Sequence, residues 1–432
     1  MNHMSHRHWV VRRNRRLLGL LLVLLLVPNV SHSYSVLSHE AIVDSLWEPA
    51  IRPLILQRFP NLTAEQLQQA RAYAYGGCII QDMGYYPFGS HLFTDLLHYV
   101  RTGDFVMALL RDSQDQNDYA FALGSMAHYF SDTVGHPLAI NPSVPMRYPR
   151  LHQEFGDYVT YAEAPKQHVL VEFSFDVVQV AGGAYLPKAY HDFIGFQVAK
   201  PLLERAFLET YGIQMKDVFF SEDIAIGTYR YSVAQLIPNA TRAAWSEKSA
   251  EIQKLTPGVQ RNKFVFRISR KDYEQQYGSV YDRPGFRARF LGWLLRIIPK
   301  IGPFRTLAFK PPLPKMETLF LQSFQSVHQR YGETLQQLQA GDEFILPNED
   351  LDTGNLAWRG EYPLADKTYA DLMDKLADHK FAGVTPALRA DISHFYSNPS
   401  PVLVSSGKNV RRWNKTKQEV DDLRAATLAP AN

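Results

Sequence analysis

The chain has 432 residues, nearly balanced charges, with 46 Lys and Arg against 43 Asp and Glu, and a single cysteine. One cysteine excludes a framework of internal disulfides. The formal net charge of +3 comes from the first 33 residues, which carry five arginines and no acidic residue, so the remainder has a net charge of −2. That charge gives no overall attraction to nucleic acid, and we expect no specific nucleic-acid partner.

The first segment, residues 1–33, has the organisation of a secretory signal peptide. Arginines at 12–16 precede the apolar run "LLGLLLVLLLV" and the small-residue stretch "PNVSHS". The apolar run is shorter than the roughly 20 residues of a membrane-spanning helix, although an uncleaved signal anchor is the alternative. We expect export to the periplasm or the cell exterior, with a mature chain that begins at Tyr34.

The remaining chain shows mostly helical periodicity. Apolar residues recur at three- and four-residue spacing, whereas strand-like alternation is nearly confined to residues 263–270. We therefore expect an all-α, multi-helix domain over 34–250 and a mainly helical extension over 316–432 that ends in a flexible tail. The helices expected from periodicity are 37–58, 63–75, 91–111, 116–136, 186–211, 222–236, 316–339 and 366–377.

The region between these two parts, residues 251–315, is expected to be a basic linker. Its segment 285–315 contains seven basic residues, several aromatic and aliphatic residues, and no acidic residue. This composition is typical of a helix that lies at a membrane surface, which predicts peripheral membrane contact. A core helix whose arginines reach solvent is the alternative.

A polar residue stands at every fourth position of "HYFSDTVGH": His128, Asp132 and His136. At 3.6 residues per turn these side chains share one face of a helix. They could form a metal site, a general acid–base pair or a polar stripe in contact with water. Further histidines and carboxylates lie nearby in the sequence, and such mixtures without thiolate are typical of catalytic zinc sites. Histidines merely scattered over surface and core are the alternative.

Four features together resemble the zinc-dependent phospholipase C superfamily, which includes the S1/P1-type nucleases. They are an aromatic residue with a histidine five positions on, Tyr34 and His39; the segments "GGCIIQDMGYYP" and "SHLFTDLLHYV"; the helix motif described above, followed by Pro137; and "HQEFGDYV". The spacing in the helix motif is most similar to the catalytic domain of glycosylphosphatidylinositol-specific phospholipase D. The resemblance implies an all-α bundle of the zinc-dependent phospholipase C type.

The resemblance further implies a cluster of two or three zinc ions in which Asp132 bridges two. It assigns Tyr34, His39 and Asp132 to the first ion, Asp82, His91, His128 and Asp132 to the second, and His136 and His152 to the third. The acid that the family places four residues after the third-site histidine is Gly156 here. We prefer Asp157 to Glu154 as its substitute, because Glu154 should point to the opposite side of a helix. A weaker or missing third metal is the alternative.

The function implied by the resemblance is that of a secreted phosphodiesterase that hydrolyses phospholipids with a zinc-activated water. Asp82 would orient that water as a general base. Cleavage on the phospholipase C or the phospholipase D side of the phosphate is left open, as is the oligomeric state. A nuclease is one alternative, although nucleases of this type start Trp-Gly and this chain is expected to start Tyr-Ser. The other alternative is a non-catalytic, metal-binding surface protein, which the missing acid at Gly156 suggests.

Three further features rank lower as metal sites. His98 and His168 fit no position in the assigned pattern, and for His168 we expect a structural role. Asn348, Asp350 and Asp352 offer oxygen atoms but lack the spacing of a known calcium-binding loop.

Overall fold

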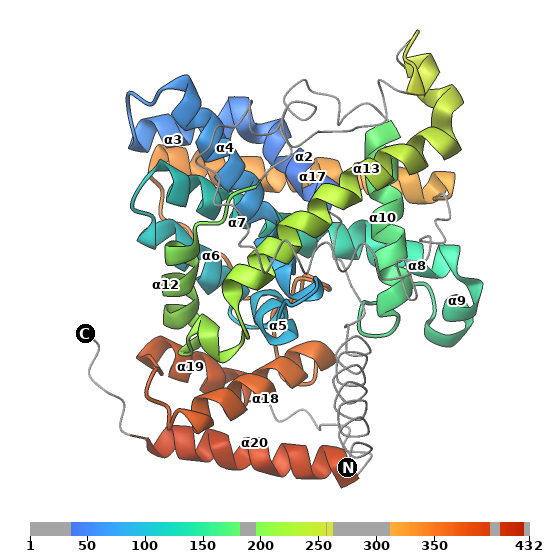
Figure 1. Ribbon diagram of the computed structural model, residues 1–432. Helices are drawn as coiled ribbons and strands as arrows, with labels where there is room; N and C mark the ends of the chain where they lie inside the picture. Colours follow the sequence, from blue (N-terminus) through green and yellow to red (C-terminus); the bar gives the residue numbers. More distant parts are fainter. Residues whose placement is uncertain (1–35, 182–195, 256, 262–311, 398–406, 427–432) are drawn as a thin grey trace, which may run out of the picture.

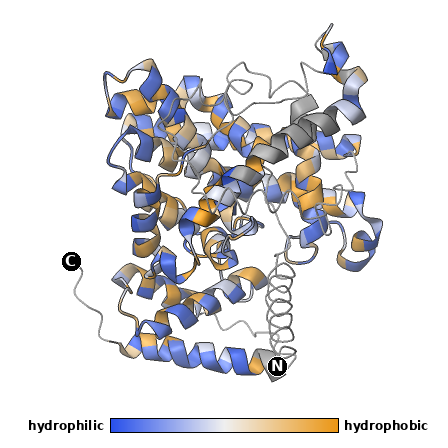
Figure 2. Cartoon of the chain, viewed as in Figure 1, coloured by the Kyte–Doolittle hydropathy of each residue, from blue (hydrophilic) through white to orange (hydrophobic). Residues whose placement is uncertain are grey.

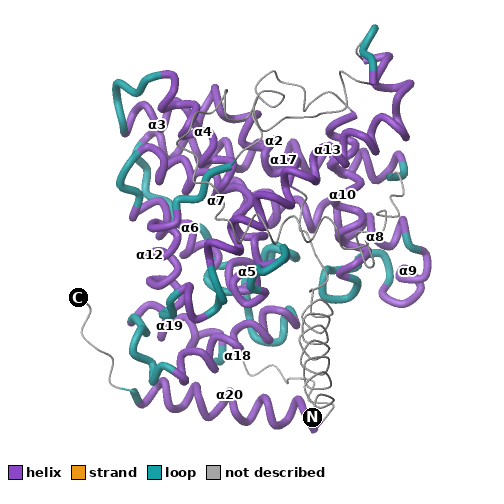
Figure 3. The backbone as a smooth tube through the Cα atoms, viewed as in Figure 1, coloured by secondary structure: helices purple, strands orange, loops and turns teal. Residues whose placement is uncertain are grey.

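The computed structural model of the chain describes residues 36–181, 196–255, 257–261, 312–397 and 407–426 (Figure 1). This part consists of helices and connecting loops (Figure 3), with one isolated β-bridge between Glu349 and Leu356. The predicted all-α fold is confirmed. The expected signal segment, Tyr34, the expected strand over 263–270 and residues 285–311 lie outside the described residues.

The first described helices follow the expected helix over 37–58 with an irregular turn in its middle. Helix α2 spans Val36–Leu46, a π-helical turn spans Trp47–Ile51, and α3 spans Arg52–Arg58. Pro53 has no N–H to donate to the preceding turn, which accounts for the loss of regular α-helical bonding there. The irregular turn lies beyond His39, so α2 itself holds this histidine on a regular helix.

Helix α4, Ala64–Ile79, begins at a capping box in which Thr63 and Gln66 exchange side-chain hydrogen bonds with each other's backbone. It runs directly into the 3₁₀ turn Ile80–Tyr85, which carries the buried Asp82. The glycine-led segment noted in the sequence therefore supplies the end of one helix and a tight turn. That turn holds Asp82 without the freedom of a long loop.

Helix α7, Gln116–Gly135, passes very close to α4. It begins at Asp115, whose side chain accepts two backbone N–H bonds at the helix start. A Cβ atom on Gly124 would lie 2.0 Å from the carbonyl oxygen of Ala74, and one on Gly77 would lie 1.9 Å from that of Phe121. The two glycines thus allow a close backbone approach that brings the Asp82 turn beside α7.

Gly124→Ala should therefore lower the free energy of unfolding of the full chain by about 1–3 kcal/mol, because the new methyl group overpacks the α4–α7 contact. Gly332→Ala is the matched control, since its Cβ would lie 3.5 Å from Leu46 Cδ2, an ordinary contact. Alanine in that helical position, where a methyl group fits at ordinary contact distance, should stabilise the chain by up to about 1 kcal/mol. Denaturant unfolding measures both changes, and equal changes would contradict close packing at Gly124.

The expected single helix over 91–111 is wrong. The chain forms α5, His91–Tyr99, and α6, Thr102–Asp112, separated at Arg101, whose φ of +49° is left-handed. The guanidinium of Arg101 bonds to the carbonyl of Thr210 at 2.6 Å and pairs with the Asp104 carboxylate, so tertiary contacts hold a conformation that the sequence periodicity does not reveal.

Beyond α7 the chain forms a π-helical turn, His136–Ile140, and two short helices, α8 (Asn141–Arg147) and α9 (Pro149–Phe155). Helix α10, Pro165–Ala181, follows and was not among the expected helices. Its stretch "HVLVEFSFD" is buried on nearly every side, so the amphipathic pattern that marks a surface helix is absent.

Helix α10 packs against α2 and α13. Helix α12 spans Lys200–Tyr211, the described end of the expected helix 186–211. Helix α13 spans Glu222–Leu255, longer than the expected 222–236 and interrupted by non-helical backbone at Lys248.

The C-terminal part packs directly on these helices. Helix α17, Pro314–Ala340, runs along α7 and α2, and its Phe320 ring stacks on Phe175 of α10 at 4.6 Å between centroids. The remaining helices gather at one end of the molecule in Figure 1, where α18 contacts α5, and α20 is mostly hydrophilic (Figure 2). They are α18, Pro363–Asp378, α19, Pro386–Phe395, and α20, Gly407–Ala425.

Within the described ranges, no helix combines the length and hydrophobicity that crossing a bilayer requires.

Candidate metal centre

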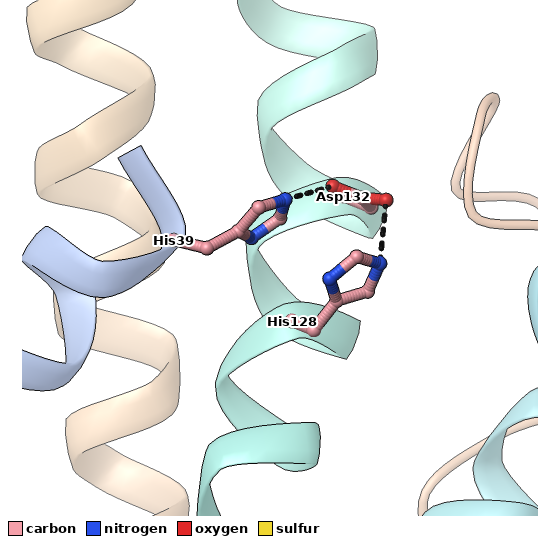
Figure 4. Close-up of side chains that lie close together, drawn as sticks. All are labelled: His39, His128 and Asp132. Atoms are coloured by element: carbon pink, nitrogen blue, oxygen red, sulfur yellow. Dashed lines mark ion pairs between the residues drawn. The ribbon is translucent and has the colours of Figure 1, made fainter. Parts of the chain in front are cut away.

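The carboxylate of Asp132, fully buried on α7, is surrounded by four imidazoles. Its Oδ1 lies 3.5 Å from Nε2 of His39 and 3.5 Å from Nε2 of His136. Its Oδ2 lies 3.1 Å from Nε2 of His128 and 3.5 Å from Nε2 of His98. Figure 4 shows two of these contacts, with His39 approaching from α2 and His128 one turn before Asp132 on α7. Each oxygen of one carboxylate thus faces its own pair of histidines.

Four potential ligand atoms form a compact group on the Oδ2 side. Nε2 of His98 lies 3.4 Å from Oδ1 of Asp82 and 3.4 Å from Nε2 of His128. With Oδ2 of Asp132, these atoms are 3.1–3.5 Å from one another along the four measured edges. Ligands about 2.0–2.1 Å from a tetrahedral zinc ion lie about 3.3 Å apart, whereas N–H···O hydrogen bonds cluster near 2.9–3.0 Å. The donor set suits a zinc ion, and the four measured distances match the edges of its coordination tetrahedron.

Hydrogen bonds from the Nδ1 atoms of His98 and His128 orient these two rings toward Asp132. Nδ1 of His128 lies 3.0 Å from the carbonyl oxygen of Cys78, and Nδ1 of His98 lies 2.9 Å from that of Thr94. A carbonyl only accepts, so each Nδ1 carries the proton and donates it, which leaves the Nε2 lone pair for a metal. The tautomer is thereby set by the backbone.

His39 reaches the same cluster from a separate helix. Its ring stacks on that of His128, with 4.2 Å between centroids. Burial, together with the neighbouring His128, lowers the pKa of His39 to about 3. A neutral imidazole at physiological pH is the form that binds a metal.

The carboxylates of this cluster are ionised. Burial by itself raises the pKa of Asp132, but His128 and His136 outweigh it and hold that pKa well below its ordinary value. Asp82 behaves in the same way, with His98 beside it lowering its pKa. Burial lowers the pKa of His98, yet Asp132 and Asp82 raise it overall to about 10, so a metal ion would displace a proton there.

A second group lies beside this cluster and comprises His136, His168 and Glu172. One potential ligand atom from each residue lies within 4.8 Å of the others, and all three residues are buried. His168 and Glu172 are one turn apart on α10, and Nδ1 of His168 lies 2.6 Å from Oε1 of Glu172. Burial raises the pKa of Glu172 to about 6.

Three of the residues assigned from the sequence lie away from these groups. His91 is the exposed first residue of α5, packed edge-on against the ring of Tyr85. His152 and Asp157 pair with each other at 3.2 Å, but their side chains are 53% and 97% exposed. The structure brings together the assigned His39, Asp82, His128, Asp132 and His136, while Tyr34 lies outside the described residues.

Two histidines that rank low as metal ligands in the sequence lie beside these groups instead. His98, two turns after His91 on α5, faces Asp82 and Asp132. His168 adjoins His136, with ring centroids 5.0 Å apart. The signal that could have identified His168 is Glu172 four residues later, because this is the histidine-to-acid spacing implied by the family resemblance, whereas Gly156 stands four residues after His152.

Residues 38–221 match the family model described as zinc dependent phospholipase C. The match supports membership of the zinc-dependent phospholipase C superfamily for this part of the chain. The family match and the buried histidine–carboxylate groups together support a phospholipid-hydrolysing metal enzyme that uses zinc. The finer resemblance to the phospholipase D type stays a prediction. No curated protein and no solved structure is detectably similar to the chain.

Proposed function

We propose that the chain is a zinc-dependent phosphodiesterase that hydrolyses phospholipids. The observation that carries this proposal is the placement of Asp132, with one carboxylate oxygen toward His39 and His136 and the other toward His98 and His128. A carboxylate so placed can bind two cations at once, and two-metal sites of this kind stabilise both the attacking and the leaving oxygen of an in-line displacement. The family match over residues 38–221 supports a phospholipid as the substrate class.

Different residues of the chain would hold the zinc ions and orient the attacking water. Asp82, His98, His128 and Oδ2 of Asp132 would hold one zinc ion, and His39 with Oδ1 of Asp132 would contribute to a second. Zinc bound there would lower the pKa of a water molecule and neutralise charge on the phosphoryl oxygens. Asp82 is ionised and buried beside this position, so it is suited to orient the attacking water and accept its proton. His136, His168 and Glu172 would hold a third ion.

Export through the segment 1–33, zinc binding by the amino group of Tyr34 and membrane contact through 285–315 remain part of this proposal. Support for the second of these comes from α2, whose His39 lies 3.5 Å from Oδ1 of Asp132, and from the contacts at the start of that helix. The carboxylate of Asp176 accepts hydrogen bonds from the backbone N–H groups of Leu37 and Ser38, at 3.2 and 3.0 Å, and so fixes the helix end that follows Tyr34.

The test is hydrolysis of phosphatidylcholine vesicles by the purified full chain, with single-stranded DNA as the competing substrate. We expect a water-soluble product from the lipid, and its identity, phosphocholine or choline, distinguishes cleavage on the two sides of the phosphate. Removing zinc with a chelator should lower the rate at least ~10²-fold, and added zinc should restore it. Zinc-dependent cleavage of DNA without lipid hydrolysis would establish the nuclease alternative instead.

A further inference from the structure

The loop between α17 and α18, residues 341–362, delivers a buried carboxylate to the metal centre. Oδ1 of Asp352 lies 2.9 Å from Nδ1 of His136 and 3.3 Å from Nε2 of His168. Its Oδ2 accepts hydrogen bonds from the backbone N–H of Tyr161, at 3.0 Å, and from the hydroxyl of Tyr362, at 2.5 Å. Asp352 lies more than 100 residues beyond the part of the chain that matches the family model.

This loop is fixed against the helices that carry the metal-binding side chains. The N–H of Leu351 bonds to the carbonyl of His98 at 2.9 Å, and the side-chain amide of Asn141 bonds to the carbonyl of Asp352 at 2.7 Å. Gly354 has a φ of +70°, and a Cβ atom there would lie 2.5 Å from the carbonyl oxygen of Thr133, the residue after Asp132. The loop therefore sits directly on the backbone of α7.

Asp350 shapes the turn that presents Asp352. Its side chain accepts hydrogen bonds from the backbone N–H groups of Asp352 and Thr353, at 3.1 and 2.8 Å. An aspartate that bonds to its own backbone two and three residues on is a standard way to close a turn. The position of Asp352 is thus set by the local turn as well as by its partners.

We propose that Asp352 is a positioning residue for the metal centre, an inference that rests on the proposed function. Its carboxylate accepts a hydrogen bond from the Nδ1–H of His136, which leaves the Nε2 lone pair of His136, 3.5 Å from Oδ1 of Asp132, to bind a metal. The Nδ1 atoms of His98 and His128 donate hydrogen bonds to backbone carbonyls, whereas Nδ1 of His136 donates to a carboxylate. Because the carboxylate carries a full negative charge, it makes the imidazole of His136 a more basic ligand. Asp352 also contacts His168, whose Nε2 lies 3.3 Å from Oδ1 of Asp352 and 2.7 Å from Oδ1 of Asn141, so Asn141 and Asp352 together hold His168 beside His136.

The test compares zinc binding by the full chain and by Asp352→Asn. Replacing such a partner of a metal-binding histidine typically lowers metal affinity 10–100-fold, and we expect a loss of that size for the most weakly held zinc ion. Competition with a chromophoric chelator measures it. The visible spectrum of the cobalt-substituted protein should also change, because an altered imidazole alters the metal's ligand field, which a distant structural defect would not do.

Two further variants make the result specific. Glu361→Gln is the matched control, because Glu361 is an exposed carboxylate of the same loop that contacts Asn355 rather than the cluster, and it should bind zinc normally. Tyr362→Phe removes one donor to Asp352 and should shift zinc affinity in the same direction as Asp352→Asn, by less. Unchanged zinc affinity and cobalt spectrum in Asp352→Asn would overturn the inference while the proposed function stands. An unaltered chain that binds no zinc would overturn both.

Discussion

Asp132→Asn is expected to lower phospholipid hydrolysis at least ~10³-fold and to release more than one equivalent of zinc per chain. The reason is that an amide offers one oxygen where the carboxylate offers two, and it carries no charge. In the structure each oxygen of Asp132 faces a different pair of histidines. One substitution therefore removes a ligand from two metal positions. Hydrolysis of phosphatidylcholine and elemental analysis of the same sample measure the two effects.

Asp118→Asn is the matched control for this experiment. Asp118 lies in the first turn of the same helix, α7, and pairs at 3.6 Å with Arg205, away from the cluster. This variant should keep its zinc and its activity. If Asp132→Asn also kept full zinc content and activity, the bridging role of Asp132 would be refuted.

His98→Ala is expected to lower activity at least ~10²-fold and to release the zinc ion that it shares with Asp82 and His128. His91→Ala should leave activity and zinc content within about twofold of the unaltered chain, because an exposed substitution changes energies by about 0.5 kcal/mol or less. The two histidines belong to one helix, α5, so each variant controls for effects on that helix. Hydrolysis of phosphatidylcholine and elemental analysis of zinc measure the effects of both variants.

This pair decides between the assignment made from the sequence and the one that the structure supports. A larger loss in His91→Ala than in His98→Ala would restore the assignment made from the sequence. It would also require α5 to shift along its axis by about two turns, since seven residues at 1.5 Å each span about 10.5 Å.

The residues that α7 supplies to the candidate metal centre could be predicted because their arrangement is local. His128, Asp132 and His136 are spaced by four residues, and helical geometry alone places them on one face. His39 and Asp82 came from the family resemblance, and the structure places both beside α7. Asp82 lies in the turn that directly follows α4, a helix whose capped start at Thr63 the sequence also marks.

The choice between His91 and His98 could not be made from periodicity. Residues seven apart lie almost two full turns apart, so they share a helix face and differ only in height along the axis. That height depends on how α5 packs against the turn that carries Asp82, which is a tertiary property. The left-handed Arg101, which separates α5 from α6, is another such property, held by the distant Thr210.

The sequence did not predict the group of His136, His168 and Glu172, and the reason is different. Helix α10 is buried on nearly all sides, so its apolar run hid both the helix and the spacing of His168 and Glu172. His152 follows the family motif in the sequence, but its side chain is exposed and lies away from the cluster. The contact of Asp352 with His136 joins residues 216 positions apart, and no local pattern predicts such a contact.

The measurement that tests the central claim most directly is the zinc content of the purified full chain, determined by elemental analysis beside activity during stepwise return of zinc to the metal-free protein. We expect at least two zinc equivalents per chain, and phosphatidylcholine hydrolysis that stays near zero until the sites around Asp132 are filled. A chain that holds less than one equivalent of any metal and hydrolyses the lipid at the same rate in the presence of chelator would contradict the account.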